Sequence, residues 1–232
     1  MLHLFADKWL RTAVQSLLYV HQTILAIVAP PVCARCKTVL LQDTVLCTLC
    51  APRIQKVTSH ALVITKKYTV TVFAASLYQD IVQELIRAKQ QRKMYAARLL
   101  GALIWEYTDL ANQSFDYIVP VPLHWRRYAR RGYNQAYEMA IALSKKSGKP
   151  VLNCLQRVRS TKIQAGLSGE ERIENVKEAF AVVERYALLV SGARILLVDD
   201  VLTTGSTMRA CVRALRMKRP SLIIGAVAAR VN

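Results

Sequence analysis

The sequence is poor in acidic residues. Only 15 Asp and Glu stand against 33 Lys and Arg, so the formal net charge is +18. A surplus of this size favours an anionic partner, such as nucleic acid, a phosphorylated metabolite or an anionic membrane surface. The alternative that the protein is simply basic stays open, because net charge alone identifies no ligand.

Low-complexity segments are also missing, and hydrophobic residues make up 53% of the 232 positions. This composition excludes disorder as the main state, because the chain has enough apolar side chains for a sizeable core. The length suits one α/β domain with a small appendage.

A long uninterrupted apolar run is absent too. Residues 12–34 contain no charged side chain, but polar residues such as Gln15 and His21 interrupt them. The run therefore falls short of the roughly 20 apolar residues of a transmembrane helix, and no cleavage site of a secretory signal precedes Pro30. Helical spacing of the apolar positions predicts an amphipathic helix over residues 1–29, which packs on the protein or, alternatively, touches a membrane or partner.

The sequence has only six cysteines, and four of them form two CxxC pairs. Such tight pairs suit a metal ion in a reducing compartment better than a disulfide framework, which predicts a cytoplasmic protein. Four thiolates complete a tetrahedral shell and leave no open position, so residues 30–58 are predicted to form a structural zinc module. Iron, a redox centre and two buried thiol pairs are the alternatives. The predicted ligands are Cys33, Cys36, Cys47 and Cys50.

Strands and helices alternate from about residue 113 onward. Short apolar runs predict buried strands at 117–121, 194–198 and 222–227, and helical patterns cover 134–146 and 205–217. This alternation predicts an α/β domain over residues 59–232, in which helices flank a parallel sheet. Cys154 and Cys211 are expected to be core residues of this domain.

The most informative segment is 195–207, where an apolar strand runs into Asp199 and Asp200 and then into a loop rich in hydroxyl groups. Backbone N–H groups of such a loop and of the following helix donate to phosphate, and Gly205 permits close backbone approach. The carboxylates would repel a bare phosphate but accept hydrogen bonds from ribose hydroxyls and bind Mg²⁺. The segment therefore predicts a sugar-phosphate site. A Walker-type loop is absent, and an acidic strand end before a capped helix is the alternative.

This segment resembles the fingerprint of type I phosphoribosyltransferases for 5-phosphoribosyl 1-pyrophosphate (PRPP). The runs at 116–122, 131–135, 161–167 and 172–180, together with the CxxC pairs, resemble the ComF family, the competence-associated branch of that superfamily. The resemblance covers residues 30–232. It implies a type I phosphoribosyltransferase-like sheet with a small N-terminal zinc ribbon.

The resemblance also implies roles for individual residues. Asp199 and Asp200 are the catalytic pair, and Mg²⁺ accompanies PRPP. The PRPP loop comprises Val201, Leu202, Thr203, Thr204, Gly205, Ser206 and Thr207. A pyrophosphate loop and a mobile closing loop are expected to contact the pyrophosphate of PRPP through Leu123, His124, Arg126, Arg127, Arg131, Gln164 and Arg172. For the arginines, a solvated basic turn is the alternative.

The ComF family is associated with DNA uptake, which implies that the protein handles incoming single-stranded DNA in natural transformation, alongside other DNA-uptake proteins. Basic clusters interleaved with aromatic residues fit such a ligand, and the C-terminal cluster is alternatively a solvated helix face. The second hypothesis is an active enzyme that transfers the 5-phosphoribosyl group from PRPP to an unidentified nitrogen acceptor. Few residues follow Thr207, so no C-terminal hood over a base is expected, and PRPP binding is better supported than transfer. The clusters are Arg87–Lys93, Arg126–Arg131, Arg157–Lys162 and Arg209–Arg219.

Overall fold

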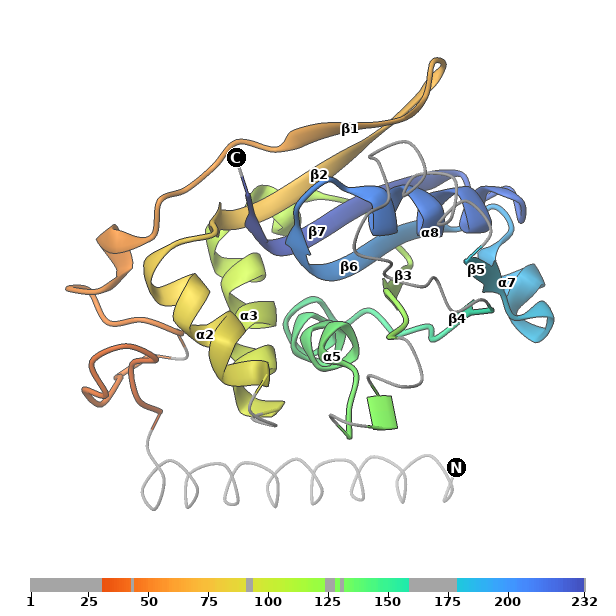
Figure 1. Ribbon diagram of the computed structural model, residues 1–232. Helices are drawn as coiled ribbons and strands as arrows, with labels where there is room; N and C mark the ends of the chain where they lie inside the picture. The colour runs from red at the N-terminus through yellow and green to blue at the C-terminus, as the bar shows by residue number, and fades with distance from the viewer. Residues whose placement is uncertain are drawn as a thin grey trace, which may run out of the picture. The chain divides into compact units, whose positions relative to one another are not determined.

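The computed structural model describes residues 31–42, 44–90, 94–123, 128–129, 132–158 and 179–231 (Figure 1). It divides into two compact units, Met1–Ala51 and Pro52–Asn232, and each is described by itself. The predicted amphipathic helix at 1–29 lies outside the described residues. Within the part of the chain that is described, no helix combines the length and apolar character needed to cross a membrane.

A five-stranded sheet forms the centre of the second unit. Four of its strands are parallel, and the fifth, β1, pairs antiparallel with β2 at one edge. This arrangement confirms the predicted parallel sheet, although the second and third predicted strands extend further than the sequence suggested. The order across the sheet is β1 (His60–Thr65), β2 (Tyr68–Leu77), β7 (Leu222–Arg230), β6 (Arg194–Leu202) and β3 (Tyr117–Pro120).

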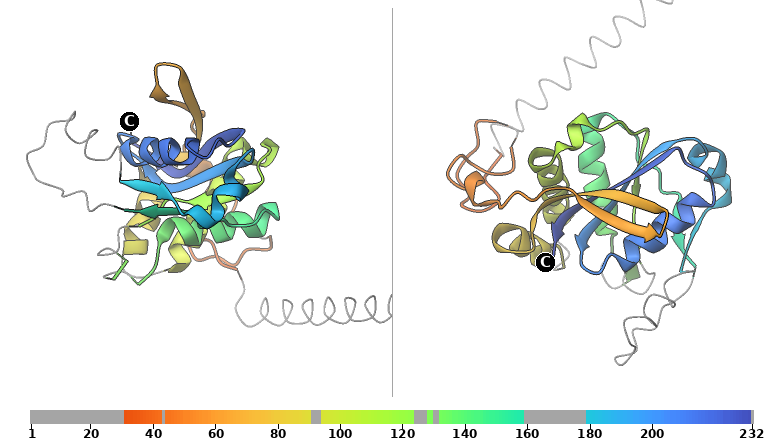
Figure 2. Two further views of the ribbon diagram at one scale, coloured as in Figure 1. Left: turned by 90° about the vertical axis from the view of Figure 1, so that its right-hand side faces the viewer. Right: turned by 90° about the horizontal axis from the view of Figure 1, so that it is seen from above.

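Helices cover both faces of this sheet (Figures 1 and 2). One face carries α2 (Asp80–Gln90), α3 (Met94–Tyr107) and α5 (Gln135–Ser147), and the other carries α8 (Ser206–Arg216). The centre of β6 is therefore fully buried from both sides, which explains its continuous apolar sequence.

Helices α3 and α5 approach each other closely at Gly101. A Cβ atom at this position would lie 2.5 Å from the backbone oxygen of Met139. The absence of a side chain therefore permits the contact between α3 and α5, two of the three helices on this face of the sheet.

The smaller elements surround this core. A separate antiparallel pair joins β4 (Leu155–Arg157) to β5 (Phe180–Val182). Short helical turns are η1 (Ala51–Arg53), η2 (Asp109–Asn112), η3 (Glu184–Tyr186) and α7 (Ala187–Val190). Cys154 and Cys211 are both fully buried in the main hydrophobic core, as predicted.

Helix α5 has the ends that its sequence predicts. Asn134 is the N-cap, and its side chain accepts a hydrogen bond from the Ala136 N–H at 3.1 Å. The same side chain donates to the Val121 carbonyl at 3.1 Å, so the helix start is tied to the segment that follows β3. Gly148 closes the helix in the left-handed conformation, with φ of 72°.

An ion pair joins the beginnings of β3 and β6, at the end of these strands away from the loop 203–207 that is predicted to bind phosphate, here called the phosphate loop. The Asp116 carboxylate accepts from the Arg194 guanidinium at 2.7 Å and from the Arg194 backbone N–H at 2.8 Å. The hydrogen bonds from Arg194 lower the pKa of Asp116 to about 2, from an ordinary value of 3.8. The folded protein therefore binds this carboxyl's proton more weakly than the unfolded chain does.

The lowered pKa predicts a pH-dependent contribution to stability. The contribution is complete above about pH 4, and it is lost as the pH falls toward 2, because the unfolded chain takes up the proton first. We expect Asp116→Asn to lower the urea midpoint at pH 6 and to have a much smaller effect near pH 2. The exposed Asp109, substituted by Asn, is the control. An equal effect of Asp116→Asn at both pH values would contradict the assignment.

Candidate functional site: a phosphate loop and a four-cysteine cluster

The candidate site lies where the parallel strands end. The Val121 N–H donates to the Val198 carbonyl and the Val231 N–H to the Leu202 carbonyl, both at 2.9 Å, so the ends of β3, β6 and β7 are held together. In open α/β sheets, ligands bind outside the carboxyl ends of the strands.

The two carboxylates lie within β6 rather than after it. The sequence predicted a strand end at Val198, but pairing with β7 continues through Asp199 to Leu202. Because side chains of neighbouring strand residues point to opposite faces, Asp199 and Asp200 extend to different sides of the sheet. The structure thus corrects the predicted end of the strand and places both acids within β6.

The Asp199 side chain is bonded to the backbone of its own strand. One of its carboxylate oxygens accepts a hydrogen bond from the Asp200 backbone N–H at 2.8 Å, which fixes the side chain against its own strand. Burial raises the pKa of the Cys211 thiol well above its ordinary value, and the negative charge of Asp199 raises it further. The Asp199 carboxylate therefore lies within electrostatic reach of α8.

The phosphate loop leads from β6 into α8. Thr203 and Thr204 are exposed, and the Thr204 hydroxyl accepts from the Ser206 N–H at 3.4 Å and donates to the Ser206 hydroxyl at 3.2 Å. Gly205 is the N-cap of α8 and supplies no side-chain cap. The first N–H groups of a helix need a partner from outside it, so a loop that offers these groups together with hydroxyls suits an anion.

Both the backbone conformation and the surroundings of position 205 require glycine. Its φ of 71° lies in the left-handed region, and a Cβ atom would lie 2.6 Å from the Leu62 Cδ1 atom of β1. The loop thus packs directly on β1, a strand that the sequence did not predict.

Arginines of helix α8 form hydrogen bonds with the backbone of the β1–β2 hairpin. The Arg209 Nε donates to the Val63 carbonyl at 2.8 Å and its Nη1 donates to the Thr204 carbonyl. Arg213 donates to the Ile64 carbonyl at 3.3 Å.

The next arginine of this face, Arg216, lies over the Tyr68 ring at 3.9 Å from the centroid. These residues were predicted to form a nucleic-acid cluster or a solvated face. Their contacts show that they fasten the hairpin to α8, and their predicted role toward nucleic acid stays a prediction. In the same stretch, Lys218 pairs with Glu184 at 2.7 Å.

Of the predicted pyrophosphate and closing-loop residues, the structure describes Leu123, which follows β3 and lines a cavity of about 540 Å³. The others lie outside the described residues, and these are His124, Arg126, Arg127, Arg131, Gln164 and Arg172.

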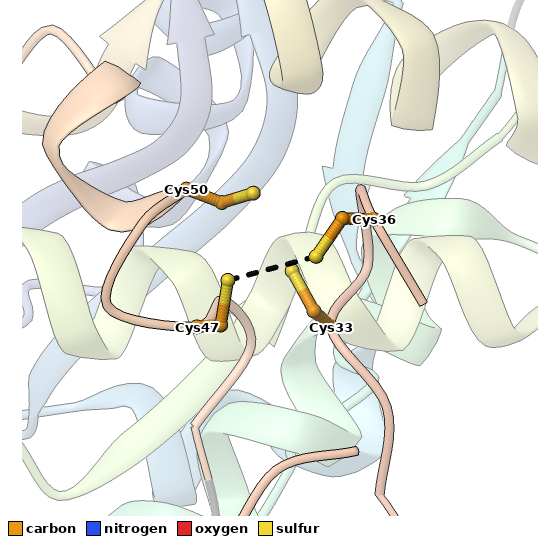
Figure 3. Close-up of side chains that lie close together, drawn as sticks. All are labelled: Cys33, Cys36, Cys47 and Cys50. Carbon is orange, nitrogen blue, oxygen red and sulfur yellow. Dashed lines mark hydrogen bonds between the residues drawn. The ribbon is translucent and has the colours of Figure 1, made fainter. Parts of the chain in front are cut away.

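The four predicted cysteine ligands come together in the first unit (Figure 3). Their sulfur atoms all lie within 4.8 Å of one another, and the Cys36 and Cys47 sulfurs are 3.6 Å apart. A tetrahedral ion with metal–sulfur bonds of about 2.3 Å places its sulfurs about 3.8 Å apart. The cluster can therefore hold a metal ion.

The thiols differ in acidity before a metal binds. Hydrogen bonds with Thr38 lower the pKa of Cys36 to about 6, whereas burial raises the pKa of Cys50 to about 12. A metal ion would therefore bind Cys36 as a thiolate that is already largely ionised, and it would have to displace the proton of Cys50.

Comparison with known proteins agrees with these features. Residues 89–232 match the family model described as phosphoribosyl transferase domain. Competence protein F of Haemophilus influenzae is 38% identical over 141 residues, which cover 56% of this chain and 59% of the relative. DNA utilization protein YhgH of Salmonella typhimurium is 37% identical over 126 residues, covering 52% and 54%.

A third relative matches over a longer stretch. Competence protein ComFC of Bacillus subtilis is 22% identical over 204 residues, covering 77% of this chain and 81% of the relative. The first two matches, in contrast, span little more than half the length of the relatives.

Proposed function

Since the chain belongs to the phosphoribosyltransferase-domain family, in its competence-associated ComF branch, we propose that it binds PRPP with Mg²⁺ and acts in DNA uptake. In this role it handles incoming single-stranded DNA in the cytoplasm, together with other DNA-uptake proteins. The observation that carries the proposal is the pair Asp199–Asp200 on β6, followed at once by the phosphate loop at the start of α8.

Each part of the site has a distinct task in this proposal. Asp199 and Asp200 accept hydrogen bonds from the ribose hydroxyls and help to hold Mg²⁺, which would neutralise the pyrophosphate charge. The loop 203–207 donates to the 5′-phosphate through backbone N–H groups and hydroxyls. The pyrophosphate lies beside Leu123, His124 and the arginines at 126, 127 and 131, while Gln164 and Arg172 belong to the loop that closes over it.

The cysteine cluster holds a structural zinc ion. Four thiolates leave no position for water or substrate, so the ion stabilises the first unit and takes no part in chemistry at the phosphate loop. The names of the relatives favour the DNA role over the alternative, a transferase of nucleotide metabolism.

Calorimetric titration with PRPP and Mg²⁺ tests the site. We expect binding to weaken at least tenfold in Asp199→Asn and in Asp200→Asn, because each variant loses a negative acceptor for hydroxyls and Mg²⁺. Asp109→Asn, on the exposed turn η2, is the matched control and should bind like the wild type. If the wild-type protein ignored millimolar PRPP, the proposal would be wrong.

A further inference from the structure

A cavity of about 540 Å³ lies beside the segment that follows β3. Its described lining comes from four parts of the second unit: Met94 at the start of α3, Pro122 and Leu123 after β3, Tyr128 with residues of the stretch 132–138, and residues of the stretch 153–157 that contains β4. A volume of this size falls within the range of about 300–1,000 Å³ that is usual for small-molecule sites.

Tyrosines dominate one wall. Tyr128 is 53% exposed and Tyr137 is 37% exposed, whereas Tyr133 is buried at 6%. The first two rings are therefore accessible to a ligand, and the third forms part of the floor. Aromatic rings of this kind bind flat, unsaturated ligands by stacking, whatever the identity of the base.

Polar groups also line the cavity. Asn153 and Gln156 are exposed, and their amides donate and accept hydrogen bonds, as the edges of nucleobases require. Arg157 lies there as well, with its guanidinium 5.4 Å from the centroid of the Phe180 ring.

The charges of the described cavity lining are balanced. Among its described lining residues, Arg157 is the only cation and Glu138 the only anion. Glu138 already accepts a hydrogen bond from the Arg98 Nε at 2.7 Å. A site with balanced charge, stacking rings and amides suits a neutral, planar ring with polar edges.

We propose that this cavity receives one unpaired base of a single-stranded DNA, stacked on Tyr128 and Tyr137. The inference rests on the proposed role in handling single-stranded DNA, and it adds the place where a base is held. The net charge of +18 supplies attraction for the sugar-phosphate backbone, while the tyrosines distinguish a strand with bases from one without.

Fluorescence anisotropy with two labelled oligonucleotides tests the cavity. One is oligo-dT, and the other is an abasic strand of equal length and charge. We expect the wild type to bind oligo-dT about tenfold more tightly than the abasic strand, and the double variant Tyr128→Ala/Tyr137→Ala to lose that difference. Tyr128→Phe/Tyr137→Phe should keep it, because the rings remain. Tyr95→Ala is the control, since Tyr95 is 62% exposed and lies outside the cavity lining.

Photocrosslinking provides an independent reading with the unaltered protein. A strand that carries 5-iodouracil should crosslink to the peptide that contains Tyr128 or Tyr137. Crosslinks confined to other peptides would overturn the assignment. Complete loss of the crosslink in the presence of an equal concentration of thymidine monophosphate would also overturn it, because a free nucleotide would then be the occupant.

The outcomes separate this inference from the proposed function. If the wild type binds both strands equally, or if the alanine variant keeps its preference for oligo-dT, the cavity proposal is wrong while DNA binding stands. If the wild type binds neither strand at low salt, both proposals fall.

Discussion

The double variant Cys33→Ser/Cys50→Ser will purify without zinc and without an ordered cysteine module. Among the described residues of the first unit, only five apolar side chains are buried, and two of these are the cysteines themselves; the five are Cys33, Leu40, Val45, Leu46 and Cys50. Three aliphatic side chains form too small a core to keep so short a segment folded. The proposed zinc ion would supply the missing stability, since structural zinc contributes on the order of 10–16 kcal/mol in comparable small modules.

Metal content per chain, measured by mass spectrometry, and protease cleavage between residues 31 and 51 both report this effect. Cys154→Ala is the matched control, because Cys154 is buried in the core of the second unit and is not part of the metal cluster. That variant should keep one zinc ion and resist cleavage within the module. A double serine variant that still carries stoichiometric metal would show that other groups bind it.

The substitution Gly205→Ala will destabilise the protein and remove PRPP binding. A left-handed backbone costs a residue with a Cβ atom about 1–2 kcal/mol, and forcing that atom against Leu62 costs about 1–3 kcal/mol more. The atom would lie 2.6 Å from Leu62 Cδ1, well inside van der Waals contact. We therefore expect the free energy of unfolding to fall by about 2–5 kcal/mol, with the loop displaced from the geometry that a phosphate needs.

Two further variants divide this effect into its causes. Gly192 has nearly the same φ, 70°, but a Cβ atom there would meet nothing within 4 Å, so Gly192→Ala measures the backbone cost alone. Adding Leu62→Ala to Gly205→Ala opens the space and should restore part of the PRPP affinity, although it removes a buried side chain. If urea unfolding showed equal losses for Gly205→Ala and Gly192→Ala, the contact with Leu62 would have no energetic role.

The parts of the fold that could be predicted are those with a strong local signal. The run 195–198 is apolar throughout because both faces of β6 are covered, and the spacing of the CxxC pairs already implied four converging sulfurs. Helix α5 begins at an Asn cap and ends at Gly148, and both signals are readable in the sequence. The loop between β6 and α8 was likewise predictable, because its residues are contiguous, and its binding of phosphate stays a proposal.

Other features depend on contacts between distant segments. In β1, only alternate residues are buried, and its run of six residues is too short to identify a strand before its partner β2 is known. The arginines of α8 looked like a charged surface, because their acceptors lie about 146 residues earlier in the chain. The tyrosine-lined cavity combines Tyr128 and residues of the stretch 132–138 with residues of the stretch 153–157, so no local pattern predicts it.

The position of Arg209 has a thermodynamic consequence for the hairpin. One guanidinium bonds to a carbonyl of β1 and to a carbonyl of the phosphate loop, so the two segments share a single positional constraint. If this constraint contributes to ligand binding at Thr204, a partner that binds the hairpin changes the affinity of the loop for its ligand. By thermodynamic reciprocity, the ligand changes the affinity of the hairpin for the partner by the same factor. The β1–β2 hairpin is therefore the surface from which the occupancy of the loop can be sensed at a distance.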